Sequence, residues 1–289
     1  MRFGTTTVPI AGWLADSSHP EESRTRQLAA VRTLVEGYGL AAVEVNPELS
    51  TLFPQIFDSD FYAALGQLQR ELGFVCTVHL PFLWLDCSSL NEAVRQVSVD
   101  HIGRSIQLVR SLEVVTYVLH LWGFTTMRIS GEFHDPQRVL PAIQTQARRS
   151  LVQFSKMVEP RSLCVENLES PAFAHFAPLV EELGLSICLD VGHLAWQGGD
   201  ELGFLTQYGD RIREVHLHDA LRTAVEGVSQ VRDHLALGHG QIDYVSFLEA
   251  LHDRGYDGTV IIEVNAREDL EESLTRLQPF LARSAVPKH

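Results

Sequence analysis

The sequence predicts an α/β protein, a single (β/α)8 barrel (TIM barrel) that spans residues 1–289. Short β-rich runs alternate with longer helical patterns eight times along the chain, and this alternation is typical of that barrel. No Pro-, Gly- or Ser-rich linker divides the sequence, so one domain is expected. A doubly wound open sheet is the alternative, but no glycine-rich phosphate loop follows the first strand.

Each strand is expected where a short apolar run is followed by polar or turn residues. The expected strands are residues 2–6, 42–46, 75–80, 116–121, 163–167, 187–191, 213–217 and 259–264. The expected helices are residues 21–37, 58–72, 90–112, 136–158, 171–183, 199–208, 243–254 and 269–281. Gly37, Gly73 and Gly255 mark the ends of the helices expected at 21–37, 58–72 and 243–254. Ser89 is the expected N-cap of the helix at 90–112.

The composition indicates a soluble globular protein, with 45% hydrophobic and 21% charged residues. A net charge of −14 repels polyanions, so a long nucleic acid is not the expected partner. The sequence shows neither an apolar stretch long enough for a membrane span nor a signal-peptide core at its N-terminus. Cys76, Cys164 and Cys188 lie in strand patterns and Cys87 in a loop, which favours a reducing cytoplasm over disulfide formation.

The segment LSICLDVGHL, residues 185–194, contains the clearest candidate for a functional strand end. Its apolar run ends at Asp190, and His193 follows three residues later. Because barrel active sites form where strands run into the following loops, both side chains are candidate metal ligands. Polar residues lie at the ends of the other strands too, namely Glu44, Asn46, His79, His120, Glu166, Asn167, His216, His218, Asp219, Asp233, His234 and Glu263.

A single histidine in an apolar strand is more often a hydrogen-bonded core residue than a ligand, and Glu166 or Glu263 alone could form an internal ion pair. Several carboxylates and imidazoles buried together nevertheless need cations, and these segments contain little Lys or Arg. Divalent metal ions would supply that charge, and imidazole with carboxylate favours zinc, manganese or iron over calcium.

These residues resemble the xylose-isomerase-like barrel superfamily, which includes sugar isomerases and epimerases and the apurinic endonuclease IV family. The resemblance covers nearly the whole chain. It implies that Glu166, Asp190, His216 and Glu263 hold one ion and that His193 contacts the substrate.

The endonuclease branch implies further ligands for two or three ions in total. His79 and His120 match its histidines on strands three and four, and His234 matches its loop histidine before the turn at residues 237–240. Arg232 stands where that branch has an aspartate, while Asp233 directly precedes His234, so the third ion site is open to question.

The local phrases GTT, TVHLP, LNEAVRQVSV, YVLHL, CVENL, ICLDVGHL, VHLHD and DHLAL resemble the cobamide-remodelling phosphodiesterases. This resemblance implies hydrolysis of a small-molecule phosphodiester in the nucleotide loop of a cobamide. Glu166 and Glu263 would be the catalytic residues in that reaction. His79, His120, Glu166, Asp190, His193, His216, Asp233, His234 and Glu263 would bind the metal ions, with His218 and Asp219 supporting the ligands or contacting the substrate.

Aromatic residues near the same strand ends are either core residues or the mouth of a site for a large flat ligand. They are Trp13, Phe82, Trp84, Trp122, Phe124 and Trp196, of which Trp84 and Trp122 are the candidate substrate contacts.

The alternative function is a sugar or sugar-phosphate isomerase or epimerase with one divalent metal. Glu166 and Glu263 would then exchange a proton at the carbon next to a carbonyl. This alternative leaves His79 and His120 without a shared role. A third hypothesis is a barrel that only binds a metal or ligand.

Overall fold

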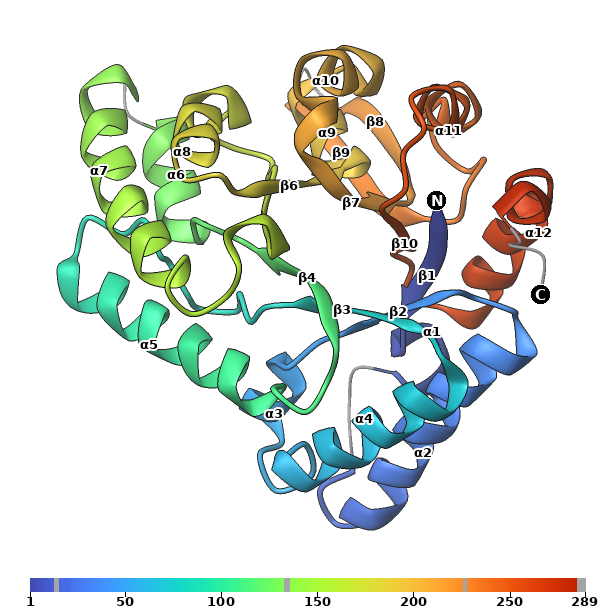
Figure 1. The fold of residues 1–289 in the computed structure, drawn as a ribbon. Helices are drawn as coiled ribbons and strands as arrows, with labels where there is room; N and C mark the ends of the chain where they lie inside the picture. The colour runs from blue at the N-terminus through green and yellow to red at the C-terminus, as the bar shows by residue number, and fades with distance from the viewer. Residues whose placement is uncertain (13–15, 133–135, 226–227, 285–289) are drawn as a thin grey trace.

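A closed barrel of eight parallel strands forms the centre of the computed structural model, which describes residues 1–12, 16–132, 136–225 and 228–284 (Figure 1). The predicted TIM barrel is therefore confirmed. Its strands are β1 (Arg2–Thr6), β2 (Ala42–Val45), β3 (Val75–His79), β4 (Val114–Leu119), β5 (Leu163–Glu166), β6 (Ser186–Asp190), β7 (Ile212–Leu217) and β10 (Thr259–Ile262). The barrel closes between β1 and β10, where Gly4 pairs with Ile261. The extent of the domain, residues 1–289, stays a prediction.

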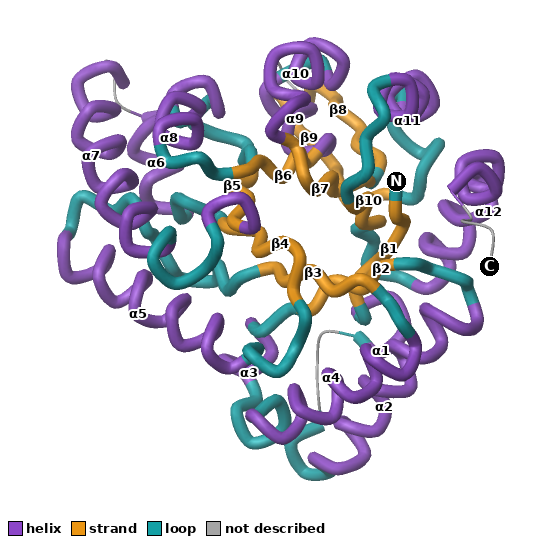
Figure 2. Tube along the Cα trace, in the orientation of Figure 1, coloured by secondary structure: helices purple, strands orange, loops and turns teal. Residues whose placement is uncertain are grey.

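Helices surround the ring of strands (Figure 2). Those at predicted positions are α2 (Pro20–Arg32), α4 (Ser59–Leu72), α5 (Glu92–Leu108), α7 (Pro136–Phe154), α8 (Ala177–Glu182), α10 (Glu201–Tyr208), α11 (Tyr244–Asp253) and α12 (Arg267–Ser284). Each coincides with a predicted helix. The predicted cap of α5 was wrong by two residues: Asn91 caps the helix by accepting from Ala93 N, and Ser89 Oγ accepts from Asn91 N instead.

The sequence prediction missed four short helices and one hairpin. The helices are α1 (Val8–Ala11), α3 (Glu48–Leu52), α6 (Phe124–Glu132) and α9 (Val191–Gln197). The hairpin pairs β8 (Asp219–Val225) with β9 (Val228–Leu235) in an antiparallel sheet after β7, and it packs against α9. Charged residues are spaced through both hairpin strands, so neither has the apolar run by which the barrel strands are recognised.

The barrel strands are apolar because both of their faces are covered. Every residue of β2, β5, β6 and β10 is buried, as expected for parallel strands between a packed interior and a helical layer. All four cysteines are buried and unpaired. Among the described helices, none combines the length and apolarity needed to cross a membrane.

Gly4 allows β1 and β2 to lie close together. A Cβ at this position would approach the Ala42 carbonyl oxygen to 2.4 Å, and that backbone atom cannot move without disturbing the barrel. We expect Gly4→Ala to destabilise the protein by about 1–3 kcal/mol, the usual cost of overpacking. Thermal unfolding measures this effect.

Gly37→Ala is the matched control, because a Cβ there would meet Thr33 Cγ2 only at an ordinary 3.6 Å. Equal melting temperatures for the two variants would contradict the packing explanation.

Candidate metal centre

Three carboxylates face one histidine nitrogen at the carboxyl end of the barrel. The Nδ1 atom of His216, on β7, lies 3.1 Å from Glu166 Oε1 and 3.3 Å from Glu263 Oε2. Asp190 Oδ2 lies 3.9 Å from the same nitrogen. Glu166 and Asp190 end β5 and β6, and Glu263 directly follows β10. The structure thus brings together the four residues for which the superfamily resemblance implied a shared metal ion.

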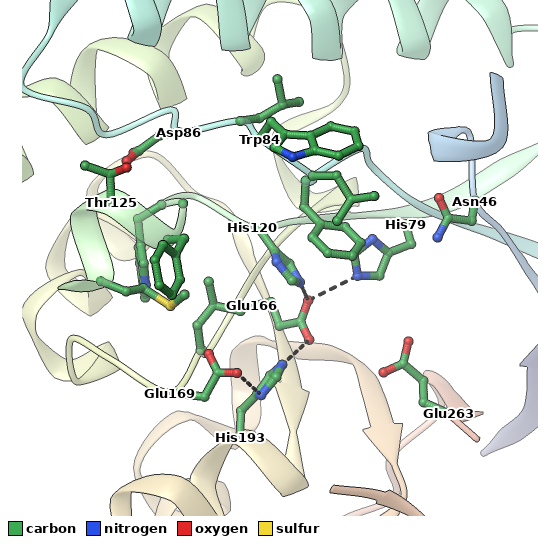
Figure 3. A pocket seen from close by; sticks show the side chains of 18 of the residues that line it. Asn46, His79, Trp84, Asp86, His120, Thr125, Glu166, Glu169, His193 and Glu263 are labelled. Carbon is green, nitrogen blue, oxygen red and sulfur yellow. Dashed lines mark ion pairs between the residues drawn. The ribbon is translucent and has the colours of Figure 1, made fainter. Parts of the chain in front are cut away.

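Two further histidines, His79 and His120, approach one oxygen of Glu166 (Figure 3). The Nε2 atoms of His79 and His120 lie 3.5 and 2.8 Å from Glu166 Oε2. Glu166 therefore faces His216 with one oxygen and these two histidines with the other. His193 Nε2 lies 3.8 Å from Glu166 Oε1, and its Nδ1 lies 3.4 Å from Glu169 Oε1.

Local hydrogen bonds fix the position of Asp190. Its Oδ1 accepts from His193 N at 2.6 Å, so Asp190 is the N-cap of α9, and this cap places His193 in the first turn. The side chain of Asn167 bonds both the N–H and the C=O of Asp190, at 2.9 and 2.8 Å. The spacing of Asp190 and His193 in the sequence is thus that of a capped helix start.

His218 and Asp219 are fully buried and do not line the cavity. His218 Nε2 lies 3.2 Å from both oxygens of Asp190, and its ring lies where a Cβ of Gly192 would otherwise be. Asp219 accepts hydrogen bonds from the backbone N–H groups of Gly238 and Ile242. Of the two roles expected for this pair, the positions fit support of the ligands rather than contact with a substrate.

Asp233 and His234 lie at the end of the hairpin strand β9. His234 Nε2 is 3.7 Å from Glu263 Oε2, and its Nδ1 is 3.2 Å from Asp233 Oδ1. Asp233 also accepts from Trp196 Nε1 at 3.0 Å. Asp233 lines the cavity, whereas Arg232 is exposed. Whether this pair binds an ion stays a prediction.

The carboxylates and histidines of the centre shift one another's pKa values toward the charged forms. Burial alone would raise the pKa of Glu166, but His120 and His216 outweigh it and hold this pKa well below its usual range. Burial alone would lower the pKa of His79, but Glu166 and Glu44 raise it to about 9. The carboxylates are therefore ionised, and positive charge must accompany them.

The donor set fits a divalent metal ion. Among the described residues, the buried atoms Glu166 Oε2, His120 Nε2 and His193 Nδ1 lie near groups of opposite charge but make no hydrogen bond of good geometry. Unpartnered buried polar atoms are costly, and coordination of a metal would satisfy them. Cys188 also lies near Glu166 and His216, but it does not line the cavity. The donors described above are imidazole and carboxylate, which suits zinc, manganese or iron.

A cavity of about 1040 Å³ opens from this centre. Among the aromatic residues expected near it, Phe82, Trp84, Trp122 and Phe124 line the cavity. Trp84 is 80% exposed, whereas Trp122 is buried, stacks on Phe176 and donates from Nε1 to Ser170 O at 2.7 Å. Trp13 lies outside the described residues.

Sequence analysis did not single out Glu169 or Glu214. Glu169 lines the cavity and approaches His193; its signal was its place at the end of the phrase VENLE. Glu214 lies inside the barrel near His216 and Glu44, where burial and Glu44 raise its pKa to about 8. Its signal in the sequence was its position two residues before His216, because alternate residues of a strand share one face.

A family model described as "Xylose isomerase-like TIM barrel" matches residues 32–282. The chain is 26% identical over 227 residues to the uncharacterized protein MJ1311 of Methanocaldococcus jannaschii, covering 75% of this chain and 73% of that one. It is also 30% identical over 108 residues to an inosose dehydratase of Lacticaseibacillus casei, a match that spans only 33% of this chain and 34% of the dehydratase.

Two solved structures share the fold over nearly their whole length. A D-tagatose 3-epimerase-like protein superimposes with a TM-score of 0.74 at 22% identity, covering 98% of both chains. A 3-keto-D-glucoside 4-epimerase from E. coli gives a TM-score of 0.69 at 16% identity, covering 98% of this chain and 99% of the other.

These comparisons contradict the predicted phosphodiesterase. The similar proteins are sugar epimerases and dehydratases, so the assignment to cobamide or other phosphodiester hydrolysis was wrong. The misleading features were His79 and His120, which suggested additional metal ions. In the structure both face one oxygen of Glu166, an arrangement that fits pairing with this carboxylate as well as binding of a further ion.

Proposed function

The chain belongs to the xylose isomerase-like TIM barrel family, and on this basis we propose that it is an isomerase or epimerase of a sugar or sugar phosphate. The observation that carries the proposal is that two ionised carboxylates, Glu166 and Glu263, lie within 3.1 and 3.3 Å of the same nitrogen of His216. Two carboxyl groups at one site are what proton exchange next to a carbonyl requires.

Glu166, Asp190, His216 and Glu263 would hold one divalent ion. When bound, this ion would supply Lewis-acid polarisation of the substrate carbonyl and an adjacent hydroxyl. The sequence-based expectation of two or three ions stays a prediction. Elemental analysis showing two ions per chain would make His79 and His120 ligands, rather than charge partners of Glu166.

The two glutamates would carry the proton. In one direction, Glu166 takes the proton from the carbon next to the carbonyl. The C–H electron pair forms a C=C bond to the carbonyl carbon, and the C=O π pair moves onto the oxygen. Glu263, after receiving a proton from His234 at 3.7 Å, returns it to the opposite face of that carbon. Return to the same carbon re-forms the C=O bond and gives an epimer. Return to the former carbonyl carbon gives an isomer, in which the hydroxyl on the first carbon passes its proton to the enolate oxygen and becomes the new carbonyl. Exchange with solvent restores both groups.

Hydrogen exchange in D2O tests this proposal. Protein loaded with Mn²⁺ is incubated with a panel of ketoses and keto glycosides and followed by NMR. We expect deuterium at the carbon next to the carbonyl together with a new epimer or isomer. No exchange with any member of the panel would count against the proposal.

A dehydratase is the second candidate, favoured by the partial match to inosose dehydratases. It would begin with the same proton abstraction, but the substrate would then lose its β-hydroxyl group as water. Mass spectrometry of the products separates the two functions, because an epimer keeps the mass of the substrate and a dehydration product does not.

Glu44 lies behind His216, on the side away from the three carboxylates. Its Oε2 is 3.4 Å from His216 Nε2, and both side chains are fully buried. A carboxylate at this position keeps the proton on Nε2 and leaves Nδ1 free to bind a metal. We expect Glu44→Gln to weaken Mn²⁺ binding by about 10–100-fold, as measured by calorimetry.

Glu182→Gln is the control for this substitution. Glu182 pairs with Arg148 on the surface and does not line the cavity. Unchanged Mn²⁺ affinity in a folded Glu44→Gln variant would show that Glu44 does not orient the histidine.

A further inference from the structure

The cavity has two chemically different walls. One wall carries the donors of the metal centre, including Glu166, His193 and Glu263. The other, here called the apolar wall, consists of Phe82, Leu83, Trp84, Leu85 and Phe124, from the segments after β3 and β4. Figure 3 shows Trp84 beyond His79 and His120, on the side away from His193 and Glu263.

The apolar wall begins directly at the metal centre. The Phe82 ring lies 4.6 Å from the His120 ring and 5.2 Å from the His79 ring, measured between centroids. A molecule that reaches Glu166 in this cavity therefore also has the apolar wall within reach. The two walls form one binding site rather than two separate ones.

The protein holds this wall exposed at an energetic cost. Trp84 is 80% and Phe124 71% exposed. Trp84 also has a φ of +61°, a left-handed conformation that costs a non-glycine residue about 1–3 kcal/mol. The loop is held in place by the buried Glu48, whose Oε2 accepts from Phe82 N and Leu83 N at 2.9 Å each. An exposed aromatic on a loop fixed in this way indicates a ligand-binding surface.

The cavity is larger than a simple sugar needs. At about 1040 Å³ it lies just above the range, about 300–1,000 Å³, of pockets for drug-sized ligands. A free monosaccharide is much smaller and carries hydroxyl groups on all sides. It would satisfy the polar wall and leave the apolar wall in water.

We propose that the substrate is a keto sugar that carries a planar apolar group on its anomeric carbon, in other words a keto glycoside. This inference rests on the proposed function and specifies its substrate class. The ketone lies at Glu166 and Glu263, and the planar group packs between Trp84 and Phe124. Proton exchange at the carbon on the side of the ring ketone away from the anomeric carbon breaks only a C–H bond, so the anomeric substituent stays attached throughout the reaction.

A second copy of the chain is the competing occupant of the apolar wall. Leu90 and Val97, near and on α5, are exposed apolar residues outside the cavity and would belong to such an interface. The apolar wall is instead concave and continuous with the metal centre, which favours a small molecule.

The test compares two probes that differ only in the anomeric substituent, p-nitrophenyl 3-keto-β-D-glucoside and methyl 3-keto-β-D-glucoside. Binding to the Mn²⁺-loaded full chain is measured by calorimetry. We expect the aryl glucoside to bind at least about tenfold more tightly, a difference of about 1.4 kcal/mol. Trp84→Ala should reduce this preference to less than about threefold, and Trp84→Phe should keep most of it.

Val97→Ala is the control, because Val97 is 62% exposed and does not line the cavity. Equal affinities for the two probes, binding of neither, or a preference that survives Trp84→Ala would each overturn the proposal. So would a dimer, detected by sedimentation, that Trp84→Ala dissociates without changing the aryl preference.

The failure of this inference can be distinguished from failure of the proposed function. If the protein catalyses hydrogen exchange on free ketoses but shows no preference for the aryl probe, the isomerase or epimerase function is supported and the keto glycoside substrate is contradicted. If the protein prefers the aryl probe but catalyses no hydrogen exchange on any keto sugar, the proposed isomerase or epimerase function is contradicted instead.

Discussion

Replacement of Glu166 by glutamine is expected to lower kcat for hydrogen exchange next to the carbonyl by about 10²–10⁴-fold, the usual contribution of a general base. The amide has the same shape but cannot accept the proton. Glu166 is also the carboxylate that faces both His216, at 3.1 Å, and His120, at 2.8 Å, so its charge organises the centre. The measurement is the initial rate of deuterium incorporation at saturating substrate.

Two further variants show whether the loss is chemical. Glu166→Asp keeps a carboxylate and should retain more activity than Glu166→Gln. Glu182→Gln removes a surface carboxylate that pairs with Arg148 and should leave the rate unchanged. A folded Glu166→Gln variant with a rate within threefold of the wild type would exclude Glu166 as the base.

Removal of the metal is expected to produce the largest change in stability. A ligand at about 100 times its Kd stabilises the folded state by about 2.7 kcal/mol, which corresponds to roughly 5 °C in the Tm of a protein of this size. Without the ion, Glu166, Asp190 and Glu263 face one another with only imidazole protons as counter-charge. Calorimetric scans with EDTA, and again after Mn²⁺ is restored in excess, measure the difference.

The control for metal removal is His216→Asn, in which the nitrogen shared by the three carboxylates is absent. This variant should have a lower Tm than the wild type and should not respond to Mn²⁺. A wild-type Tm that is the same with EDTA and with Mn²⁺ would exclude a metal-stabilised centre.

Local sequence patterns were enough to find the strands of the barrel. All eight observed barrel strands begin and end within two residues of the prediction, because strands covered on both faces are continuous apolar runs. The hairpin β8–β9 lacks such runs, because it is partly exposed and carries charged residues such as Arg222 and Arg232. The sequence prediction therefore missed it.

The function was harder to predict than the fold. Phrases such as TVHLP and VLHLW specify a histidine at the end of a buried strand, but not the partner of that histidine. In the structure, His79 and His120 face Glu166, which is compatible with charge pairing as well as with a second ion. Charge pairing and binding of a second ion give the same sequence pattern. The phosphodiesterase prediction failed because it assumed the second ion.

The sequence by itself determined the barrel and the residues at the carboxyl ends of its strands, because burial and periodicity are properties of short segments. Only the tertiary structure decided which nitrogen of His216 faces the carboxylates, and that Trp84 is exposed while Trp122 is buried. These outcomes depend on the register of strands and loops that are far apart in the chain. That register is fixed only when the barrel closes and its side chains pack.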